Sequence, residues 1–348
     1  MNFGVVGTGM IANMHAKAIS EIDGSRLVAC FDIIPERARQ FAEVYKCRFY
    51  NEFNKFLDDP EIEVINICTP SGLHSEAAIP AAESGRHIIV EKPLEITVER
   101  CLKIVEVAEK NNVVLSGIFP SRFSDASQTV KKACEAGRFG VLSQGNAYVK
   151  WWRDQQYYSQ SGWKGTKALD GGGALMNQSI HAVDLLLWFV GPISSLSAYI
   201  STVGHNKIEV EDNASAAIEF ENGALGAIQG TTAAWPGFLK RLEILGISGS
   251  AIMDEDTLSF WKFMEESAED EKIRKLFSKP ASTSGGAADP AAISYLGHKR
   301  QLIDVIDSIQ KRRKPLVDGI EATKAVACIE AIYRSAELDG APQNPAKL

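Results

Sequence analysis

The sequence lacks any apolar run long enough to cross a membrane. Its most apolar stretch, residues 185–193, is interrupted by Gly191 and Pro192 and is far shorter than the roughly 20 residues that a membrane-spanning helix needs. An excess of basic residues is also missing, since 37 Lys and Arg stand against 44 Asp and Glu, a formal net charge of −7. Because such a surface repels phosphate backbones and anionic lipids, we expect neither nucleic acid nor membrane partners.

Paired cysteine spacings are absent as well. The six cysteines are scattered, without a CxxC motif or a histidine at metal-ligand spacing. This pattern is typical of reduced thiols and predicts neither a disulfide framework nor a metal site. The opening residues 1–7 read as a strand and show no charged leader or cleavage site, so we expect a cytoplasmic protein.

The first third of the chain alternates short apolar runs with amphipathic helical stretches. The expected strands are 3–7, 26–31, 64–68, 87–90 and 113–117, and the expected helices are 11–22, 35–45, 73–83 and 97–111. Such alternation predicts a parallel sheet with helices on both faces. We therefore expect an α/β Rossmann domain over residues 1–121.

The pattern changes after Pro120 and predicts a second, α+β domain over residues 122–348. We expect helices at 125–135, 174–189, 298–311 and 319–337, and strands at 196–203, 214–220, 224–231, 239–245 and 251–253. Glu221-Asn222-Gly223 is a hairpin signal, so the strands predict a large, open, mainly antiparallel sheet. Residues 265–290 read as a surface excursion, and the last helix is expected to pack back on the first domain.

A glycine-rich turn joins the first expected strand to the first helix, with the residues Gly7, Thr8, Gly9, Met10, Ile11 and Ala12. In a strand–turn–helix context this spacing is typical of dinucleotide binding, because Gly9 lets the pyrophosphate approach a helix N-terminus. Asp32 ends the second strand, where a carboxylate accepts hydrogen bonds from the ribose hydroxyls. The same carboxylate repels a 2′-phosphate, so NAD is favoured over NADP.

Two further segments end parallel strands at the same sheet edge, where ligands of open α/β sheets bind. Thr69 and Pro70, with His74 at the start of the next helix, are expected to contact the cofactor. Glu91-Lys92-Pro93 follows the strand 87–90, and a lysine partly shielded from water there is suited to proton transfer with a hydroxyl. An exposed lysine in an ordinary turn would give the same three residues.

Residues 170–184 form the second candidate cluster. Three glycines, 171–173, precede a helix on which Asn177, His181 and Asp184 are spaced to share one face. Glycines allow a ligand to reach the backbone, so Gly173 is a candidate for substrate contact. A histidine between apolar residues is more often a core residue, but its polar neighbours favour a site.

These features, in this order and spacing, resemble the Gfo/Idh/MocA oxidoreductase family. The resemblance implies a Rossmann domain and a sheet domain that carries the contact of a homodimer or homotetramer. It also implies an NAD-dependent dehydrogenase of sugars or cyclitols, in which Lys92 and His181 are catalytic. Asn177 stands where many members have Asp, which resembles the branch acting on pyranosides, such as levoglucosan-type and nucleotide-sugar 3-dehydrogenases.

The resemblance further implies that residues 151–167 form a lid over the substrate. Its candidate substrate ligands are Arg153, Tyr157 and Trp163, and Trp163 and Lys164 are expected to approach the cofactor together with Glu91. Two other functions remain open at this point. One is a glycosidase that retains NAD and oxidises its substrate transiently, and the other is a non-catalytic NAD-binding regulator.

Overall fold

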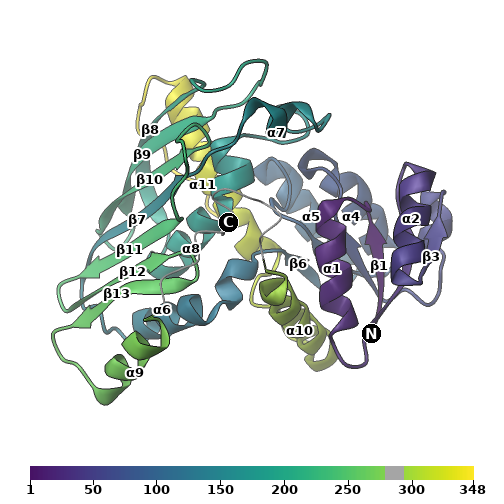
Figure 1. Ribbon diagram of the computed structural model, residues 1–348, viewed down its shortest axis with the longest axis horizontal. Helices are drawn as coiled ribbons and strands as arrows, with labels where there is room; N and C mark the ends of the chain where they lie inside the picture. The colour runs from purple at the N-terminus through teal and green to yellow at the C-terminus, as the bar shows by residue number, and fades with distance from the viewer. Residues whose placement is uncertain (279–293) are drawn as a thin grey trace. The chain divides into compact units, whose positions relative to one another are not determined.

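The chain folds into two compact units. The computed structural model describes residues 1–278 and 294–348 (Figure 1). One unit combines Met1–Pro120 with Ser294–Thr323, and the other combines the described part of Ser121–Ile293 with Lys324–Leu348. The chain therefore returns to the first unit after most of the second is complete.

The first unit is built on a six-stranded parallel sheet with the order β3-β2-β1-β4-β5-β6. The strands are β1 (Asn2–Val6), β2 (Arg26–Phe31), β3 (Arg48–Tyr50), β4 (Val64–Ile67), β5 (His87–Val90) and β6 (Leu115–Gly117). β4 is buried along its whole length, as expected for a strand covered on both faces. The predicted doubly covered parallel sheet is confirmed, while β3 escaped the prediction because it has only three residues.

Helices pack on both faces of this sheet, because right-handed crossovers run in opposite directions on the two sides of β1. They are α1 (Met10–Ser20), α2 (Pro35–Tyr45), α3 (Phe53–Leu57), α4 (His74–Glu83), α5 (Val98–Lys110) and α10 (Leu296–Lys311). α10 packs beside α1 over a core that includes Phe3, Ile19, Ile89 and Leu302. The strand order reverses between β1 and β4, which makes the carboxyl edge there the expected ligand position.

The second unit contains a seven-stranded sheet with the order β13-β12-β11-β7-β10-β9-β8, in which only β7 and β10 pair in parallel. The strands are β7 (Leu142–Lys150), β8 (Ile193–Ser201), β9 (Asn213–Phe220), β10 (Leu225–Thr231), β11 (Arg241–Gly246), β12 (Gly249–Asp254) and β13 (Thr257–Phe263). β9 alternates strictly between exposed and buried residues, so one face packs on the core and the other faces outward. The predicted mainly antiparallel sheet and the β9–β10 hairpin are confirmed.

Its helices are α6 (Asp125–Glu135), α7 (Gln155–Ser159), the π-helix η3 (Ala174–Ser179), α8 (Ile180–Val190) and α9 (Ala268–Leu276), and α11 (Gly319–Glu337) passes from the first unit into the second. α8 packs on β7 and β11 and on α6. Gly145 of β7 makes this contact possible, because a Cβ there would lie 2.7 Å from Val190 Cγ2.

The central strand β7 and the edge strand β13 of the second sheet were not predicted. Residues 265–290, expected as an excursion, contain α9, which begins with a capping box at Ser267 and Asp270. The remainder of that stretch, from residue 279, lies outside the described residues.

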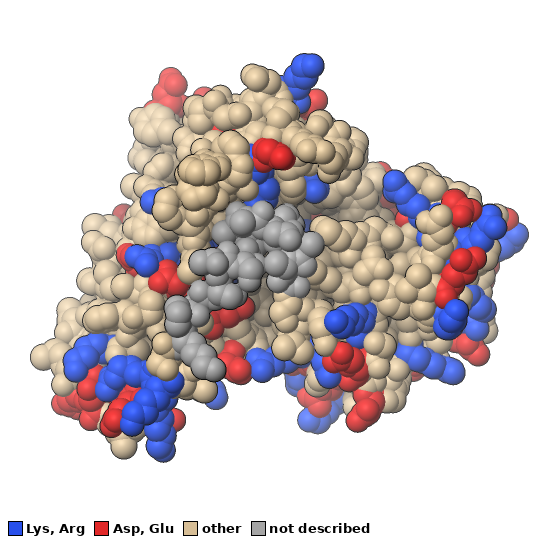
Figure 2. Space-filling model, in the orientation of Figure 1, with Lys and Arg blue, Asp and Glu red and all other residues tan. Residues whose placement is uncertain are grey.

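Charges of both signs are interspersed on the surface drawn in Figure 2, and a dense mixture of them lies over α9. Ion pairs one helical turn apart explain this mixture, such as Lys272–Glu269 and Lys275–Glu271. No helix in the described parts of the chain is both long and apolar enough to span a membrane.

Candidate active site

The glycine-rich turn lies between β1 and α1, as predicted. Gly7 has φ +84°, and a Cβ there would lie 2.8 Å from the backbone carbonyl of Cys68. Gly9 is the residue before α1, and a Cβ there would meet nothing within 4 Å. Gly7 therefore serves the packing of the turn, whereas Gly9 leaves open space in front of the free N–H groups of α1, which is where an anion binds.

Asp32 accepts three hydrogen bonds, two of them from Thr8 of this turn. Its Oδ2 accepts from the backbone N–H of Thr8 at 2.8 Å and from the Thr8 hydroxyl at 2.9 Å, and its Oδ1 accepts from Ile34 N–H at 2.9 Å. Met10 is largely exposed and Ile11 is half-buried beside it. The carboxylate therefore lies beside the glycine turn, as a ribose ligand requires.

The segment after β4 is held by His74. Both ring nitrogens of His74 face backbone carbonyls, Nδ1 that of Pro93 at 2.8 Å and Nε2 that of Thr69 at 3.0 Å. Burial lowers the pKa of this imidazole. His74 therefore links the Thr69-Pro70 turn to the Glu91-Lys92-Pro93 segment, and its predicted direct contact with the cofactor stays a prediction. Thr69 Oγ1 is buried without a hydrogen-bond partner among the described residues.

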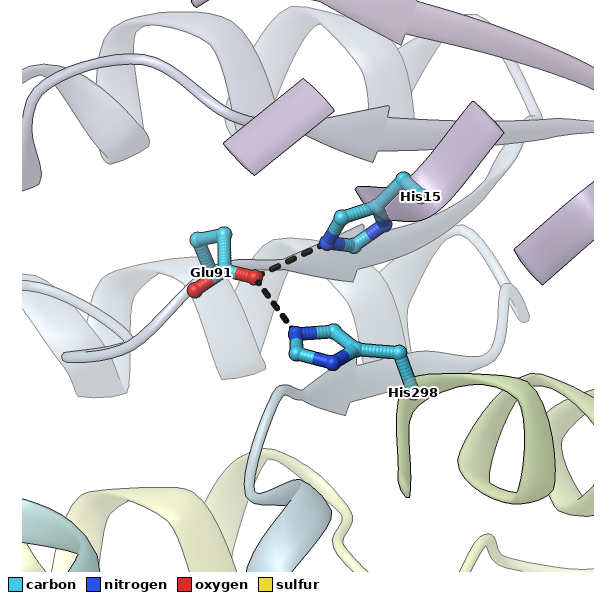
Figure 3. Close-up of side chains that lie close together, drawn as sticks. All are labelled: His15, Glu91 and His298. Atoms are coloured by element: carbon cyan, nitrogen blue, oxygen red, sulfur yellow. Dashed lines mark hydrogen bonds and ion pairs between the residues drawn. The ribbon is translucent and has the colours of Figure 1, made fainter. Parts of the chain in front are cut away.

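Lys92 is half-buried just beyond the carboxyl end of β5. Its backbone N–H donates to Glu91 Oε2 at 3.1 Å. Glu91 in turn contacts two buried histidines, His15 of α1 and His298 of α10 (Figure 3). His15 was missed by the sequence analysis, and its only signal was a polar residue on the alanine-rich inner face of α1.

Gly172 and Gly173 are packed against protein groups of the same unit. A Cβ at Gly172 would lie 2.0 Å from the Tyr333 hydroxyl, and one at Gly173 would lie 2.0 Å from the Glu211 carbonyl oxygen. Glu211 also accepts from the N–H groups of Gly173 at 3.1 Å and Leu175 at 2.8 Å, and burial raises its pKa. These contacts require small residues here, whereas the substrate contact expected of Gly173 stays a prediction.

Asn177 lies at the centre of a polar cluster in the second unit. Its amide nitrogen donates to Asp170 Oδ1, and its Oδ1 accepts from Gln178 Nε2 at 2.6 Å. Gln178 joins this pair to two residues of segment 151–167, the expected lid, namely Tyr157 through its hydroxyl at 2.8 Å and Arg153 through Nη2 at 2.9 Å. Sequence reasoning missed Asp170 and Gln178 as members of this cluster, although both lie in the segment it singled out.

Segment 151–167 also brings two cationic groups to the Tyr157 ring. Lys164 Nζ lies 3.8 Å from the ring centroid, and the guanidinium carbon of Arg153 lies 5.4 Å from it. Burial raises the pKa of Tyr157 to about 12, so its hydroxyl remains a neutral hydrogen-bonding group. Trp163 is half-buried in the same segment.

Asn177, His181 and Asp184, which were expected to share one helical face, do not lie on one continuous α-helix. Asn177 lies in the π-helix η3, whose i→i+5 hydrogen bonds widen the turn, while His181 and Asp184 lie in α8. Asp184 is buried and forms an ion pair with Arg122, with Nη2 and Oδ1 at 2.7 Å. Its expected contact with substrate stays a prediction, and the structure assigns it this partner. His181 is half-buried in the first turn of α8.

Comparisons with known proteins place the whole chain in one family. Residues 1–119 match the model of an oxidoreductase family with an NAD-binding Rossmann fold, and residues 127–252 match the C-terminal domain of the same family. Levoglucosan dehydrogenase of Pseudarthrobacter phenanthrenivorans is 28% identical over 334 residues, which is 86% of this chain and 85% of the relative. scyllo-Inositol 2-dehydrogenase (NAD(+)) of Bacillus subtilis is 30% identical over 71% of each chain.

Solved structures agree with this assignment. The WlbA dehydrogenase of Bordetella pertussis, in complex with NADH and UDP-GlcNAcA, is 33% identical and superposes with a TM-score of 0.89 over 100% of this chain and 98% of its own. The WlbA dehydrogenase of Chromobacterium violaceum is 32% identical with a TM-score of 0.90, over 100% of this chain and 97% of its own. Sequence, fold and strand order therefore agree, and the chain belongs to the Gfo/Idh/MocA family of NAD-binding oxidoreductases.

Proposed function

We propose that this protein is an NAD-dependent dehydrogenase that oxidises a hydroxyl group of a pyranose-type sugar or sugar derivative. The observation that carries the proposal is the match along the whole chain to dehydrogenases solved with NADH and a pyranose derivative. Cyclitols remain within the substrate class, because inositol dehydrogenases are also relatives.

The residues of the first unit fit NAD. Open space at Gly9 and the α1 N-terminus suit a pyrophosphate, and Asp32 suits the ribose hydroxyls. The unpartnered Thr69 hydroxyl at the carboxyl end of β4 offers a further polar group at the same edge. NAD, when bound, supplies the hydride acceptor. An aspartate with the apolar Ile33 and Ile34 after it offers no cation for a 2′-phosphate, which favours NAD over NADP.

We assign the proton chemistry to Lys92 and His181. An alcohol must lose its hydroxyl proton as the carbinol hydride leaves, and an imidazole near neutral pH accepts such a proton well. In this assignment His181 takes the proton while Lys92 hydrogen-bonds to the same oxygen and stabilises its developing negative charge. Asn177 cannot accept a proton, so it orients a substrate hydroxyl within the cluster formed with Asp170 and Gln178.

An anionic pyranose derivative is the first substrate to test. The WlbA dehydrogenases were solved with UDP-GlcNAcA. The proposed lid of this chain carries two cationic residues, Arg153 and Lys164, and both contact the Tyr157 ring. Guanidinium and ammonium groups bind carboxylates and phosphates through charge-assisted hydrogen bonds.

The decisive experiment incubates the enzyme and NAD with nucleotide-linked sugar acids, free pyranosides, anhydrosugars and inositols, and follows NADH fluorescence. Net NADH formation with a pyranose derivative supports the dehydrogenase. Glycoside cleavage or hydration without net NADH would instead support an NAD-retaining enzyme, a possibility raised by a relative that is 22% identical and named 2,7-anhydro-N-acetylneuraminate hydratase. Lys92→Ala and His181→Ala should each lose turnover while NAD binding persists, and full activity in either variant contradicts its assignment.

We further propose a cytoplasmic homodimer or homotetramer that associates through the outer face of the second sheet. That face carries exposed residues of β9, namely Ser215, Ala217 and Glu219, and the exposed Leu225 of β10. Exposed apolar side chains such as Leu225 on a sheet face are typical of a contact surface. Light scattering of the purified protein, compared with a Leu225→Arg variant, tests this association.

A further inference from the structure

The carboxylate of Glu91 is held on both of its oxygens. Its Oε1 lies 2.8 Å from His15 Nε2 and 3.5 Å from His298 Nε2 (Figure 3). Its Oε2 accepts the backbone N–H of Lys92 at 3.1 Å. The two imidazoles come from α1 and α10, and their rings meet edge to face with centroids 5.4 Å apart. One buried carboxylate therefore connects two helices to the backbone of Lys92.

The protonation of this cluster follows from its hydrogen bonds. The Asn66 amide donates to His15 Nδ1 at 2.7 Å, so the ring proton lies on Nε2 and is donated to Glu91. Burial lowers the pKa of His15. Burial also opposes ionisation of Glu91, but the hydrogen bonds from His15 and His298 outweigh it and hold the pKa of Glu91 well below its usual range. The neutral His15 ring thus donates to a charged acceptor, an arrangement that gives strong hydrogen bonds.

A divalent cation is the competing explanation, because one ligand atom from each of His15, Glu91 and His298 lies within 4.8 Å of the others. His15 Nε2 could bind a cation only after losing its proton, with the proton moved to Nδ1. The Asn66 amide would then have to rotate and present Oδ1, which has no partner among the described residues. The hydrogen-bonded arrangement needs neither change, so we favour it.

We propose that His15 and His298 are positioning residues that fix Glu91 and, through its contact with the Lys92 N–H, set the point from which the Lys92 side chain leaves the backbone. The following residue is fixed as well, since His74 contacts the Pro93 carbonyl at 2.8 Å. Lys92 therefore lies between two anchored residues. The inference rests on the proposed catalytic role of Lys92.

Paired substitutions test the network. His15→Leu and His298→Leu remove the Nε2 donor while keeping bulk, whereas His15→Gln and His298→Gln keep an N–H near the same place. A displacement of about 1 Å in a catalytic group can slow turnover about 100-fold, so we expect kcat to fall about tenfold or more in the Leu variants and to recover in part in the Gln variants. The dissociation constant for NAD should not change. The deuterium isotope effect on kcat, measured with substrate labelled at the oxidised carbon, should rise because hydride transfer becomes slower.

His87→Leu is the matched control. His87 lies at the opposite end of β5 from Glu91, where its Nδ1 accepts the Val114 N–H at 2.9 Å. This variant loses a partly buried histidine of the same unit but leaves the network intact, so it should lower the melting temperature without changing the isotope effect.

Three results would overturn the inference. The first is a folded His15→Leu variant with wild-type kcat and isotope effect. The second is a loss of kcat that follows the melting temperature as in His87→Leu and is not restored by Gln. The third is a stoichiometric divalent cation in the purified protein whose removal by a chelator abolishes turnover. If Lys92→Ala retains activity, the proposed function of Lys92 fails, whereas activity lost in Lys92→Ala but kept in His15→Leu refutes only the network.

Discussion

Arg122 and Asp184 form a two-pronged ion pair inside the second unit. Nη2 lies 2.7 Å from Oδ1 and Nε lies 2.9 Å from Oδ2, and the two side chains are only 2% and 1% exposed. The pair ties the start of this unit to α8, the helix that carries His181. Because both charges are buried, removing either partner deprives the other of its closest opposite charge.

We therefore expect Arg122→Met to lower the free energy of unfolding by about 3–5 kcal/mol. Urea unfolding followed by tryptophan fluorescence measures this loss. Lys275→Met is the control, since the Lys275–Glu271 pair of α9 is exposed and should contribute about 0–1 kcal/mol. Equal, small losses in both variants would show that the buried pair has no special role.

Alanine at the two glycines of the cofactor turn should separate folding from binding. Gly7→Ala places a Cβ 2.8 Å from the Cys68 carbonyl at a positive φ and should destabilise the protein by about 1–3 kcal/mol or more. Gly9→Ala meets no protein atom, so it should leave stability unchanged and weaken NAD binding by obstructing the pyrophosphate. Thermal unfolding and NADH fluorescence titration measure the two effects. A Gly9→Ala variant that binds NAD normally would argue against this position for the pyrophosphate.

Asn177→Asp should reduce activity, although it introduces the residue that many family members carry. The amide nitrogen of Asn177 donates to Asp170 Oδ1, and a second carboxylate there would repel the first or share a proton with it. We expect the unfavourable interaction between the two carboxylates to be worth at least about one pKa unit. Since one pKa unit corresponds to a factor of ten, kcat/KM should fall about tenfold or more. The double variant Asn177→Asp with Asp170→Asn exchanges the two groups and should recover part of the loss. Steady-state kinetics at pH 7 to 9 would show whether the single variant is instead active.

Stability should fall as the pH drops below neutrality, because His15 is buried as a neutral ring. Burial lowers the pKa of His15 from the ordinary value of 6.5. Just below pH 6.5, His15 is therefore protonated in the unfolded chain but still neutral in the folded chain. Unfolding free energy is therefore lost from about pH 6.5 downward, with a slope of up to about 1.4 kcal/mol per pH unit for one proton. The pKa values of His74 and His87 are lowered as well and add to the slope. His15→Gln should flatten the curve by one proton, and an unchanged slope would mean that His15 is not the group concerned.

The sequence was sufficient to predict the Rossmann unit, because its signals are local. Apolar strands such as 64–67 and the Gly7–Gly9 turn report on a few neighbouring residues each. β7 was missed for the opposite reason. Its centre holds Gly145 and Asn146, which are poor strand signals, and Asn146 is tolerated there because it donates to Glu243 and accepts from Ala227 N–H. Glu243 and Ala227 are both far from Asn146 in the sequence and meet it only in the folded sheet.

The candidate site shows the same division. Lys92 and the Asn177 segment could be identified from motifs. The variants described above test whether Lys92 is catalytic and whether Asn177 binds substrate. The partners that hold them could not be identified. His15 and His298 lie near opposite ends of the chain, and neither Asp170 nor Gln178 has a sequence spacing that predicts its hydrogen bond to Asn177. The change from π-helix to α-helix between Asn177 and His181 is also not revealed by residue spacing.

The return of α10 to the first unit has a consequence for biosynthesis. At 5–20 residues per second, residues 294–323 leave the ribosome about ten seconds or more after residue 120. During that interval the apolar surface that includes Phe3, Ile19 and Ile89 lacks the helix that later covers it. During synthesis, this apolar surface of the nucleotide-binding unit therefore stays exposed and accessible to chaperones until translation of the second half is nearly finished.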